Sequence, residues 1–309
     1  MEREFDLLVA GEINPDLILS GPALEPRFGQ QEVLVDNASL TIGSSSAIFA
    51  CGAARLGLRV VFIGVCGDDI FGKFMLDSMA ERGVDVHPVI IDSRQQTGLS
   101  VILNRDADRA ILTHVGSMAA LHAEQVSDAL LARVSHLHIA SYFLQTNLQP
   151  GLPDLFWRAR TLGLSTSLDP NWDPAGEWRG VIQVLQGTTI FFPNQTEALA
   201  VSQAADVEGA LQVLAGWVPV VAVKLGAQGA VAQSGGQFTR AATLPSRVAD
   251  TVGAGDSFDA GFIYGYLNGW SLDASLRLAV ACGTLSTRAF GGTAAQPSLE
   301  EAIQAAELT

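Results

Sequence analysis

The sequence predicts an α/β fold: three α/β/α layers around a mostly parallel sheet, with a small antiparallel β lid. Short apolar runs alternate with helical stretches up to Lys224, as in parallel sheets that helices cover on both faces. Beyond Thr251 only helical patterning follows. Two stretches, at about 17–41 and 98–116, alternate apolar and polar residues without a helical period. This alternation predicts the projecting lid, although ordinary edge strands fit the pattern equally well.

The individual elements follow from apolar runs and the residues that end them. Gly57 and Gly83 each close a helical stretch as a C-terminal cap. Pro219 precedes a strand at a position where its missing N–H removes no interior hydrogen bond. The expected strands are 7–10, 60–64, 136–140, 165–169, 189–192 and 220–224. The expected helices are 45–56, 71–81, 153–162, 208–215, 256–267, 271–288 and 298–306. Because no repeat or linker interrupts the pattern, 1–309 is predicted to be one domain.

Composition narrows the classes of function. The 309-residue chain has a net charge of −14, which argues against a broad basic surface for nucleic acid or anionic lipid. Its only lysines are Lys73 and Lys224, so an anionic ligand would be held by helix N-termini, a metal ion or single cations. The three cysteines lack CxxC spacing, and no apolar stretch is long enough for a membrane span. We therefore expect a soluble protein of the reducing cytoplasm.

Residues 250–262 carry the clearest chemical signal. Gly253, Ala254 and Gly255 precede an amphipathic helical stretch, and small residues there let backbone N–H groups converge on an anion. Asp256 follows in the first turn of that helix. This pairing suits phosphoryl transfer, in which amides stabilise the transferring group and a carboxylate accepts the hydroxyl proton. The alternative is a glycine-rich loop in which Asp256 is an ordinary N-terminal cap.

The whole of 250–262 resembles the C-terminal signature of the ribokinase-like (phosphofructokinase B-type) carbohydrate kinase family. Five further segments resemble that family's motifs and occur in the same order: 11–16, 43–72, 169–172, 193–197 and 223–229. The resemblance implies a ribokinase-like fold. It also implies an ATP-dependent kinase that transfers the γ-phosphate to a hydroxyl of a sugar or a sugar-like small molecule.

By this resemblance, Asp256 would be the general base, and the amides of Gly253, Ala254 and Gly255 would form the anion hole. The physical interpretation of the glycine-rich stretch leads to the same roles. Asp250 is a candidate ligand for a monovalent cation such as K⁺. ATP and Mg²⁺ are the expected cofactors.

The remaining phosphate-side roles also come from the resemblance. Asn194 and Glu197 would organise Mg²⁺ through water, since this ion keeps much of its hydration shell. An asparagine three residues ahead of a glutamate is also a helix-capping box, which needs no metal. Lys224, Gly226 and Gly229 would lie near the nucleotide, at the end of a strand where open α/β sheets bind ligands.

The acceptor side both matches the family and departs from it. The residues that the resemblance assigns to the acceptor are Asn14, Asp16, Gly43, Ile48, Ser141 and Asp169. Two carboxylate oxygens of Asp16 would suit a vicinal diol. The family commonly has an asparagine where Ile48 stands, and ribokinases have a glutamate where Ser141 stands. These departures disfavour ribose and favour an acceptor with a more apolar face.

Two rival functions stay open. One is a related kinase for a nucleoside, a vitamin-like alcohol or a phosphosugar, and the other is a catalytically silent binding protein on the same fold. Arg105 and Arg109, at the tip of the lid, could clamp an acidic acceptor, but solvated turn charges are the simpler interpretation. The lid is also a candidate surface for a homodimer, because projecting sheet edges invite partners.

Overall fold

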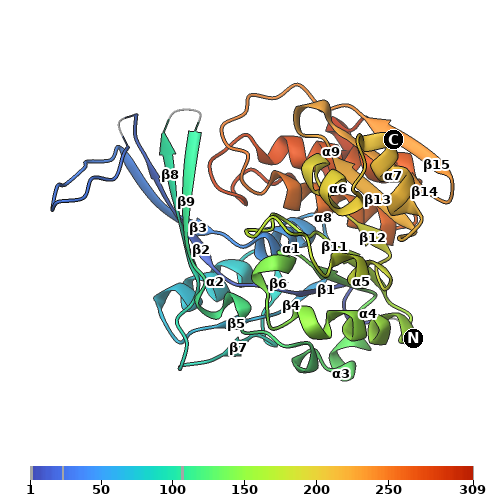
Figure 1. The fold of residues 1–309 in the computed structure, drawn as a ribbon, viewed down its shortest axis with the longest axis horizontal. Coiled ribbons are helices and arrows are strands. Elements are labelled where there is room, and N and C mark those ends of the chain that lie inside the picture. Colours follow the sequence, from blue (N-terminus) through green and yellow to red (C-terminus); the bar gives the residue numbers. More distant parts are fainter. Residues whose placement is uncertain (1–2, 23, 106–107, 309) are drawn as a thin grey trace.

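A nine-stranded sheet forms the centre of the protein (Figure 1). The structure is a computed structural model, and it describes residues 3–22, 24–105 and 108–308. Its strand order is β15-β14-β13-β12-β11-β10-β1-β4-β6. The pairs from β6 to β13 are parallel, and only β14 and β15 run antiparallel to their neighbours. The strands are β1 (Leu7–Ala10), β4 (Val60–Ile63), β6 (Val84–Asp85), β10 (His136–Ile139), β11 (Ser165–Leu168), β12 (Ile190–Phe191), β13 (Val220–Lys224), β14 (Ala230–Ser234) and β15 (Gln237–Ala241). A separate parallel pair joins β5 (Val65–Cys66) and β7 (Ile90–Ile91).

Helices cover both faces of this sheet, as the sequence predicts. Successive β1 side chains point to opposite faces, so Leu7 and Val9 enter one hydrophobic cluster while Leu8 and Ala10 enter the other. The first cluster is completed by α1 (Ser45–Arg55), α2 (Ile70–Ala80), α8 (Ala254–Leu267), α9 (Leu272–Ser286) and α10 (Leu299–Ala305). The second is completed by α3 (Asp128–Leu131), α4 (Leu152–Thr161), α5 (Val181–Leu185), α6 (Gln195–Ser202) and α7 (Val207–Ala215).

A four-stranded sheet projects from the main body as the lid (Figure 1), in the order β3-β2-β8-β9. Its strands are β2 (Pro15–Ser20), β3 (Asn37–Ile42), β8 (Leu99–Arg105) and β9 (Asp108–His114). The predicted small β lid is confirmed, but its predicted antiparallel pairing needs a correction, because β2 and β8 run parallel. Both strands leave the main layer in the same direction, so only the two hairpins that they begin are antiparallel. Residues 106 and 107 of the predicted turn lie outside the described residues.

The predicted strands and helices of the main layer lie close to their observed ranges, but β6, α3, α5 and α6 were not among them. The hairpin of β14 and β15 was not predicted, although Gly235 and Gly236 at its turn have the positive φ angles of 53° and 82° that such turns require. The helix predicted from Asp256 begins two residues earlier, at Ala254. Among the residues that the structure describes, no helix is long and apolar enough to cross a membrane.

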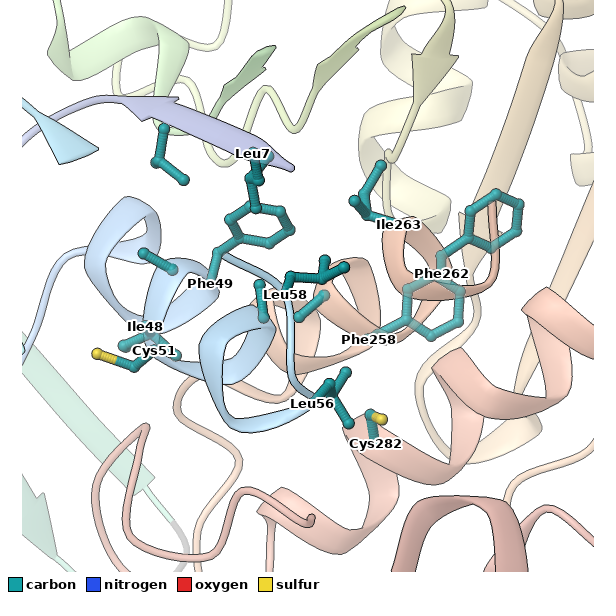
Figure 2. Close-up of a cluster of buried hydrophobic side chains, with 14 of the residues drawn as sticks. Leu7, Ile48, Phe49, Cys51, Leu56, Leu58, Phe258, Phe262, Ile263 and Cys282 are labelled. Carbon is teal, nitrogen blue, oxygen red and sulfur yellow. The ribbon is translucent and has the colours of Figure 1, made fainter. Parts of the chain in front are cut away.

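Packing of α1 against α8 fixes the position of the glycine-rich segment. Figure 2 shows Phe49 of α1 gathered with Phe258 and Phe262 of α8 in one buried cluster. These aromatic side chains are 5% exposed or less, so the two helices cannot slide without opening a cavity. The N-terminus of α8 is therefore held beside α1, at the edge of the sheet where the parallel strands end.

Candidate active site

A cavity of about 500 Å³ lies at the carboxyl ends of the parallel strands, and residues of the lid contribute to its wall. Open α/β sheets bind ligands at this edge, because the loops that follow the strands converge there. The predicted site residues that line it are Asn14, Asp16, Ile48, Ser141, Asp169, Asn194, Glu197, Lys224, Gly226, Gly253, Gly255 and Asp256. Residues separated by up to 242 positions in the printed sequence, from Asn14 to Asp256, thus meet in one place.

A second cavity of about 500 Å³ adjoins the first. Both are lined by Lys224, Gly226, Thr251 and Gly255. The predicted residues Gly229 and Ala254 line only the second cavity. Its wall is largely apolar, with Leu244, Pro245, Val248, Phe258 and Val280. After the roles that the sequence resemblance implies for their residues, we call the first the acceptor cavity and the second the nucleotide cavity.

Asp16 lies in the acceptor cavity on β2, and Gly43 makes room for it. A Cβ at Gly43 would lie 2.2 Å from the Asp16 Oδ1 atom, so no other residue type fits there without displacing the carboxylate. Asn14 donates a long hydrogen bond of 3.4 Å from Nδ2 to the same oxygen. Burial, with the nearby Asp250 charge, raises the pKa of Asp16 to about 7, and Arg109 opposes this shift.

Asp256 lies in the first turn of α8 and is only 7% exposed. Burial raises the pKa of Asp256 well above its usual value, and the neighbouring Asp169 charge adds to the shift. Lys224 and a hydrogen bond from Ser45 act in the opposite direction. A carboxylate with a raised pKa is a stronger base, which suits proton abstraction from an alcohol.

The glycine-rich turn presents the helix N-terminus to both cavities. Gly253 caps α8 with a φ of 72°, a left-handed conformation that glycine adopts without strain. Its carbonyl accepts the first hydrogen bond of the helix, from Ser257 N at 2.9 Å. The Ala254 amide donates to the Thr251 carbonyl at 3.3 Å, a long hydrogen bond, so this predicted anion-hole donor is partly engaged.

Lys224 is buried between two carboxylates. Its Nζ atom lies 2.6 Å from Asp169 Oδ2 and 3.3 Å from both oxygens of Asp259. Burial alone would lower the pKa of Lys224, but these charges outweigh it and raise the pKa. Sequence reasoning missed Asp259, although its place three residues after Asp256 on the same helix was a usable signal.

Asn194 and Glu197 form the predicted capping box at the start of α6. Asn194 Nδ2 donates to Glu197 Oε1 at 2.6 Å, and Asn194 N donates to Oε2 at 2.8 Å. The Glu197 N–H donates in return to Asn194 Oδ1 at 3.0 Å. Burial, with the Asp169 charge, raises the pKa of Glu197 to about 7. Both side chains also line the acceptor cavity, so capping leaves them at the cavity wall.

Asp250 lies outside both cavities and joins two loops. Its Oδ1 accepts from Val252 N and its Oδ2 from Gly291 N, each at 3.0 Å. Arg109 Nη1 of β9 lies 3.9 Å from Asp250 Oδ1 and also lines the acceptor cavity. Arg109 therefore faces the site from the lid, whereas Arg105 lies 4.0 Å from Glu25 at the lid's far end.

Glu12 is a second residue that sequence reasoning missed. It lines the acceptor cavity, is 2% exposed and accepts hydrogen bonds from Ser44, Ser46 and Ser141. The signal in the sequence was a glutamate two residues after a buried strand and four residues ahead of Asp16.

Comparisons with known proteins agree with this geometry. Residues 5–299 match the family model described as pfkB family carbohydrate kinase. A ribokinase from Haemophilus influenzae is 28% identical, covering 96% of this chain and 97% of its own length. A fructokinase from Klebsiella pneumoniae is 30% identical, covering 82% of this chain and 88% of its own. The chain is also similar to an E. coli protein whose crystal structure contains ATP and Mg²⁺. The two sequences are 24% identical, and the two structures match with a TM-score of 0.88 over 98% of this chain and 99% of that one.

The family model spans nearly the whole chain, and the structural likeness confirms the predicted ribokinase-like fold. The predicted activity, transfer of a phosphoryl group from ATP to an alcohol group of a sugar, is confirmed at the level of the family. The chain belongs to the pfkB family of carbohydrate kinases.

Proposed function

We propose that Asp256 takes the proton from the acceptor hydroxyl while the backbone amides at Gly253–Gly255 stabilise the transferring phosphoryl group. One observation carries this assignment: Gly255 lines both the acceptor cavity and the nucleotide cavity, and Asp256 beside it lines the acceptor cavity. Phosphoryl transfer must occur where the two substrates meet. The anion-binding end of a helix and a buried base stand together at that junction.

The nucleotide cavity fits ATP. Ser246 lines it, and the Ser246 Oγ atom is buried without a hydrogen-bond partner among the described residues, so it is available to a polar group of the nucleotide. Gly229 lets the backbone at the cavity wall pack closely against Ala241, because a Cβ there would lie 2.0 Å from the Ala241 carbonyl oxygen. The apolar side chains opposite would contact the flat faces of the base.

Mg²⁺ fits the site as an ion carried mainly by phosphates and water. No group of three or more His, Cys, Asp or Glu side chains in the described ranges could hold a metal ion by itself. Mg²⁺ commonly uses one or two carboxylates plus substrate phosphates. Asn194 and Glu197 are the side chains that would orient its water ligands. When bound, the ion would neutralise charge on the phosphates.

The acceptor fits between Asp16 and Asp256 with one apolar face. Asp16 supplies hydroxyl recognition from β2, and Asn14 supports it. The same cavity is also lined by apolar side chains, namely Ile48, Ile102, Ile111, Met118 and Leu144. A sugar presents hydroxyl groups at its edge and C–H groups on its faces, so it matches both surfaces.

A monovalent cation such as K⁺ would bind beside Asp250. This carboxylate holds the loop that leads to Gly253 against the loop at Gly291, so a cation there would add to the order of the anion hole. Replacing K⁺ by a large organic cation should then lower turnover without changing the affinity for the acceptor.

A homodimer would form through the lid. The strand β9 is a free edge of the lid sheet, and Leu112 on it is 59% exposed. Light scattering should therefore give the mass of a dimer for the parent and of a monomer for Leu112→Lys.

The three free, buried cysteines support the predicted reducing cytoplasm.

ATP turnover with a panel of acceptors tests the proposal. The panel contains ribose, fructose, 2-keto-3-deoxygluconate and nucleosides. We expect ATP-dependent phosphorylation of a sugar, with ribose a poor acceptor because Ile48 cannot hydrogen-bond a diol. Binding of ATP and a sugar without any turnover would instead identify a silent binding protein.

A further inference from the structure

We propose that Glu12 positions part of the wall of the acceptor cavity, by holding Ser44 and Ser141 in place. This inference rests on the proposed function, because it assigns the acceptor to the cavity that these residues line. Glu12 follows β1, Ser44 precedes α1, and Ser141 follows β10. One carboxylate thus joins three segments that are far apart in the sequence.

The contacts of Glu12 are short and numerous. Its Oε1 atom accepts from Ser141 Oγ at 3.0 Å and from Ser46 N at 3.2 Å. Ser44 Oγ, 3.0 Å from Oε1, shares its hydrogen with the Glu12 backbone carbonyl at 2.7 Å. The Glu12 Oε2 atom accepts from Ser46 Oγ at 2.5 Å. Hydrogen bonds to an ionised carboxylate are stronger than those between neutral groups. Glu12 therefore has enough donors to stay in place although it is buried.

The residues around Glu12 are strained in a way that requires such support. Ser44, Ser141 and Asn171 have φ angles of 63°, 50° and 51°, in the left-handed region that side-chain-bearing residues rarely adopt. All three line the acceptor cavity. Ser141 N donates to Asn171 Oδ1 at 2.6 Å, so the strained residues are also linked to one another. Such strain persists where neighbouring interactions fix the backbone, and it gathers at functional sites.

Two further features of the surroundings of Glu12 depend on its carboxylate. A Cβ at Gly11 would lie 2.0 Å from Ser46 Oγ, so the glycine lets that hydroxyl reach Glu12. The Glu12 charge also adds to burial and to Asp169 in raising the pKa of Asp256. Glu12 thus influences the proposed base, Asp256, as well as Ser44 and Ser141 at the cavity wall.

Steady-state kinetics of Glu12→Gln separates positioning from general stability. The amide keeps the size of the side chain but loses the charge that four hydrogen bonds converge on. We expect the KM for the best sugar of the panel to rise about tenfold, because the variant loses one good hydrogen bond to a charged group. The KM for ATP should change by less than about twofold. The control is Thr188→Val, which removes a buried hydrogen bond to the Val184 carbonyl away from both cavities.

A fold-anchoring role alone would predict something different: Glu12→Gln would lower the melting temperature as Thr188→Val does and leave the ratio of the two KM values unchanged. That result would overturn the proposal. If Glu12→Gln does not fold, Ser46→Ala replaces it, because Ser46 is buried outside the cavity wall and acts there only through Glu12. Ser46→Ala should raise the same KM by about threefold, as expected for one neutral hydrogen bond, and no change would contradict the proposal.

Hydrogen exchange gives a readout that needs no turnover. In Glu12→Gln, amide exchange should become faster at 44–47 and 141–145 than in Thr188→Val, and unchanged exchange there would refute the positioning role. If the parent phosphorylates no sugar, the proposed function fails, while the exchange result still decides the role of Glu12.

Discussion

The phosphate side and the acceptor side of the cleft are built by different means. On the phosphate side, backbone amides of one short segment, Gly253–Gly255, are presented by a helix that packs through Phe258 and Phe262. On the acceptor side, side chains from distant segments meet around Glu12. The proposed phosphoryl-transfer chemistry is thus encoded in one continuous stretch, whereas the proposed recognition of the acceptor depends on the convergence of the whole fold.

Among the variants that compare the two sides, glycine replacement on the phosphate side should have the largest effect. Gly253→Ala and Gly269→Ala both place a Cβ at a positive φ, of 72° and 71°, which costs about 1–2 kcal/mol. Only the Cβ at 253 meets obstacles, 2.7 Å from Gly292 Cα and 2.9 Å from Ile48 Cγ2. We expect kcat to fall about 10²-fold in Gly253→Ala alone, because the amides are displaced. Equal kcat values in the two variants would remove the argument for a backbone-built phosphate site.

The two lysines of the chain offer a matched pair. Lys224→Met leaves Asp169 and Asp259 buried without their cation, which should cost about 3 kcal/mol of unfolding free energy. Lys73→Met breaks an exposed pair with Asp77, worth about 0.5 kcal/mol or less. Urea denaturation measures both. Similar losses of unfolding free energy in the two variants would show that the buried Asp169 and Asp259 do not depend on Lys224.

Removal of one methylene group on the acceptor side should have a smaller effect. Ile48→Val and Ile263→Val each truncate a buried side chain of the same hydrophobic cluster, at about 1 kcal/mol of stability. Only Ile48 lines the acceptor cavity. The KM for the sugar should therefore change in Ile48→Val and stay constant in Ile263→Val. A constant KM in both would place the acceptor elsewhere.

The dependence of stability on pH tests one buried carboxyl group of the lid and one at the start of α6. Folding raises the pKa of Asp16 and of Glu197 to about 7, from 3.8 and 4.5. Between pH 4.5 and 7 the folded protein therefore holds protons that the unfolded chain has lost, so stability falls as the pH rises. The melting temperature of the ligand-free protein should drop by about 10 °C over this range. Asp16→Asn should make the drop smaller, and an unchanged drop would contradict the assigned shift.

The sequence was informative wherever a role depends on neighbours in the chain. Lys224 at the end of a strand, Asp256 in a first helical turn and the capping box of Asn194 and Glu197 all follow from local spacing, and the structure has each of these local features. Apolar runs likewise gave the parallel strands of the main layer, because strands buried on both faces need continuous hydrophobic residues.

What the sequence did not reveal depends on tertiary contacts. Ser141 lies 129 residues from Glu12, and nothing in the local sequence indicates that their side chains meet. The parallel pairing of β2 with β8 likewise depends on how the lid leaves the main layer. Asp259 shares a helix face with Asp256, but its contact with Lys224 depends on the fold.

The rate of phosphoryl transfer in Asp256→Asn tests the central claim most directly. Asparagine keeps the size of the side chain and removes its ability to accept a proton. In single-turnover experiments with the best sugar of the panel, the rate should fall by about 10²–10⁴, the usual contribution of a general base, while ATP and the sugar still bind. A variant that transfers the phosphoryl group as fast as the parent would contradict the role of Asp256.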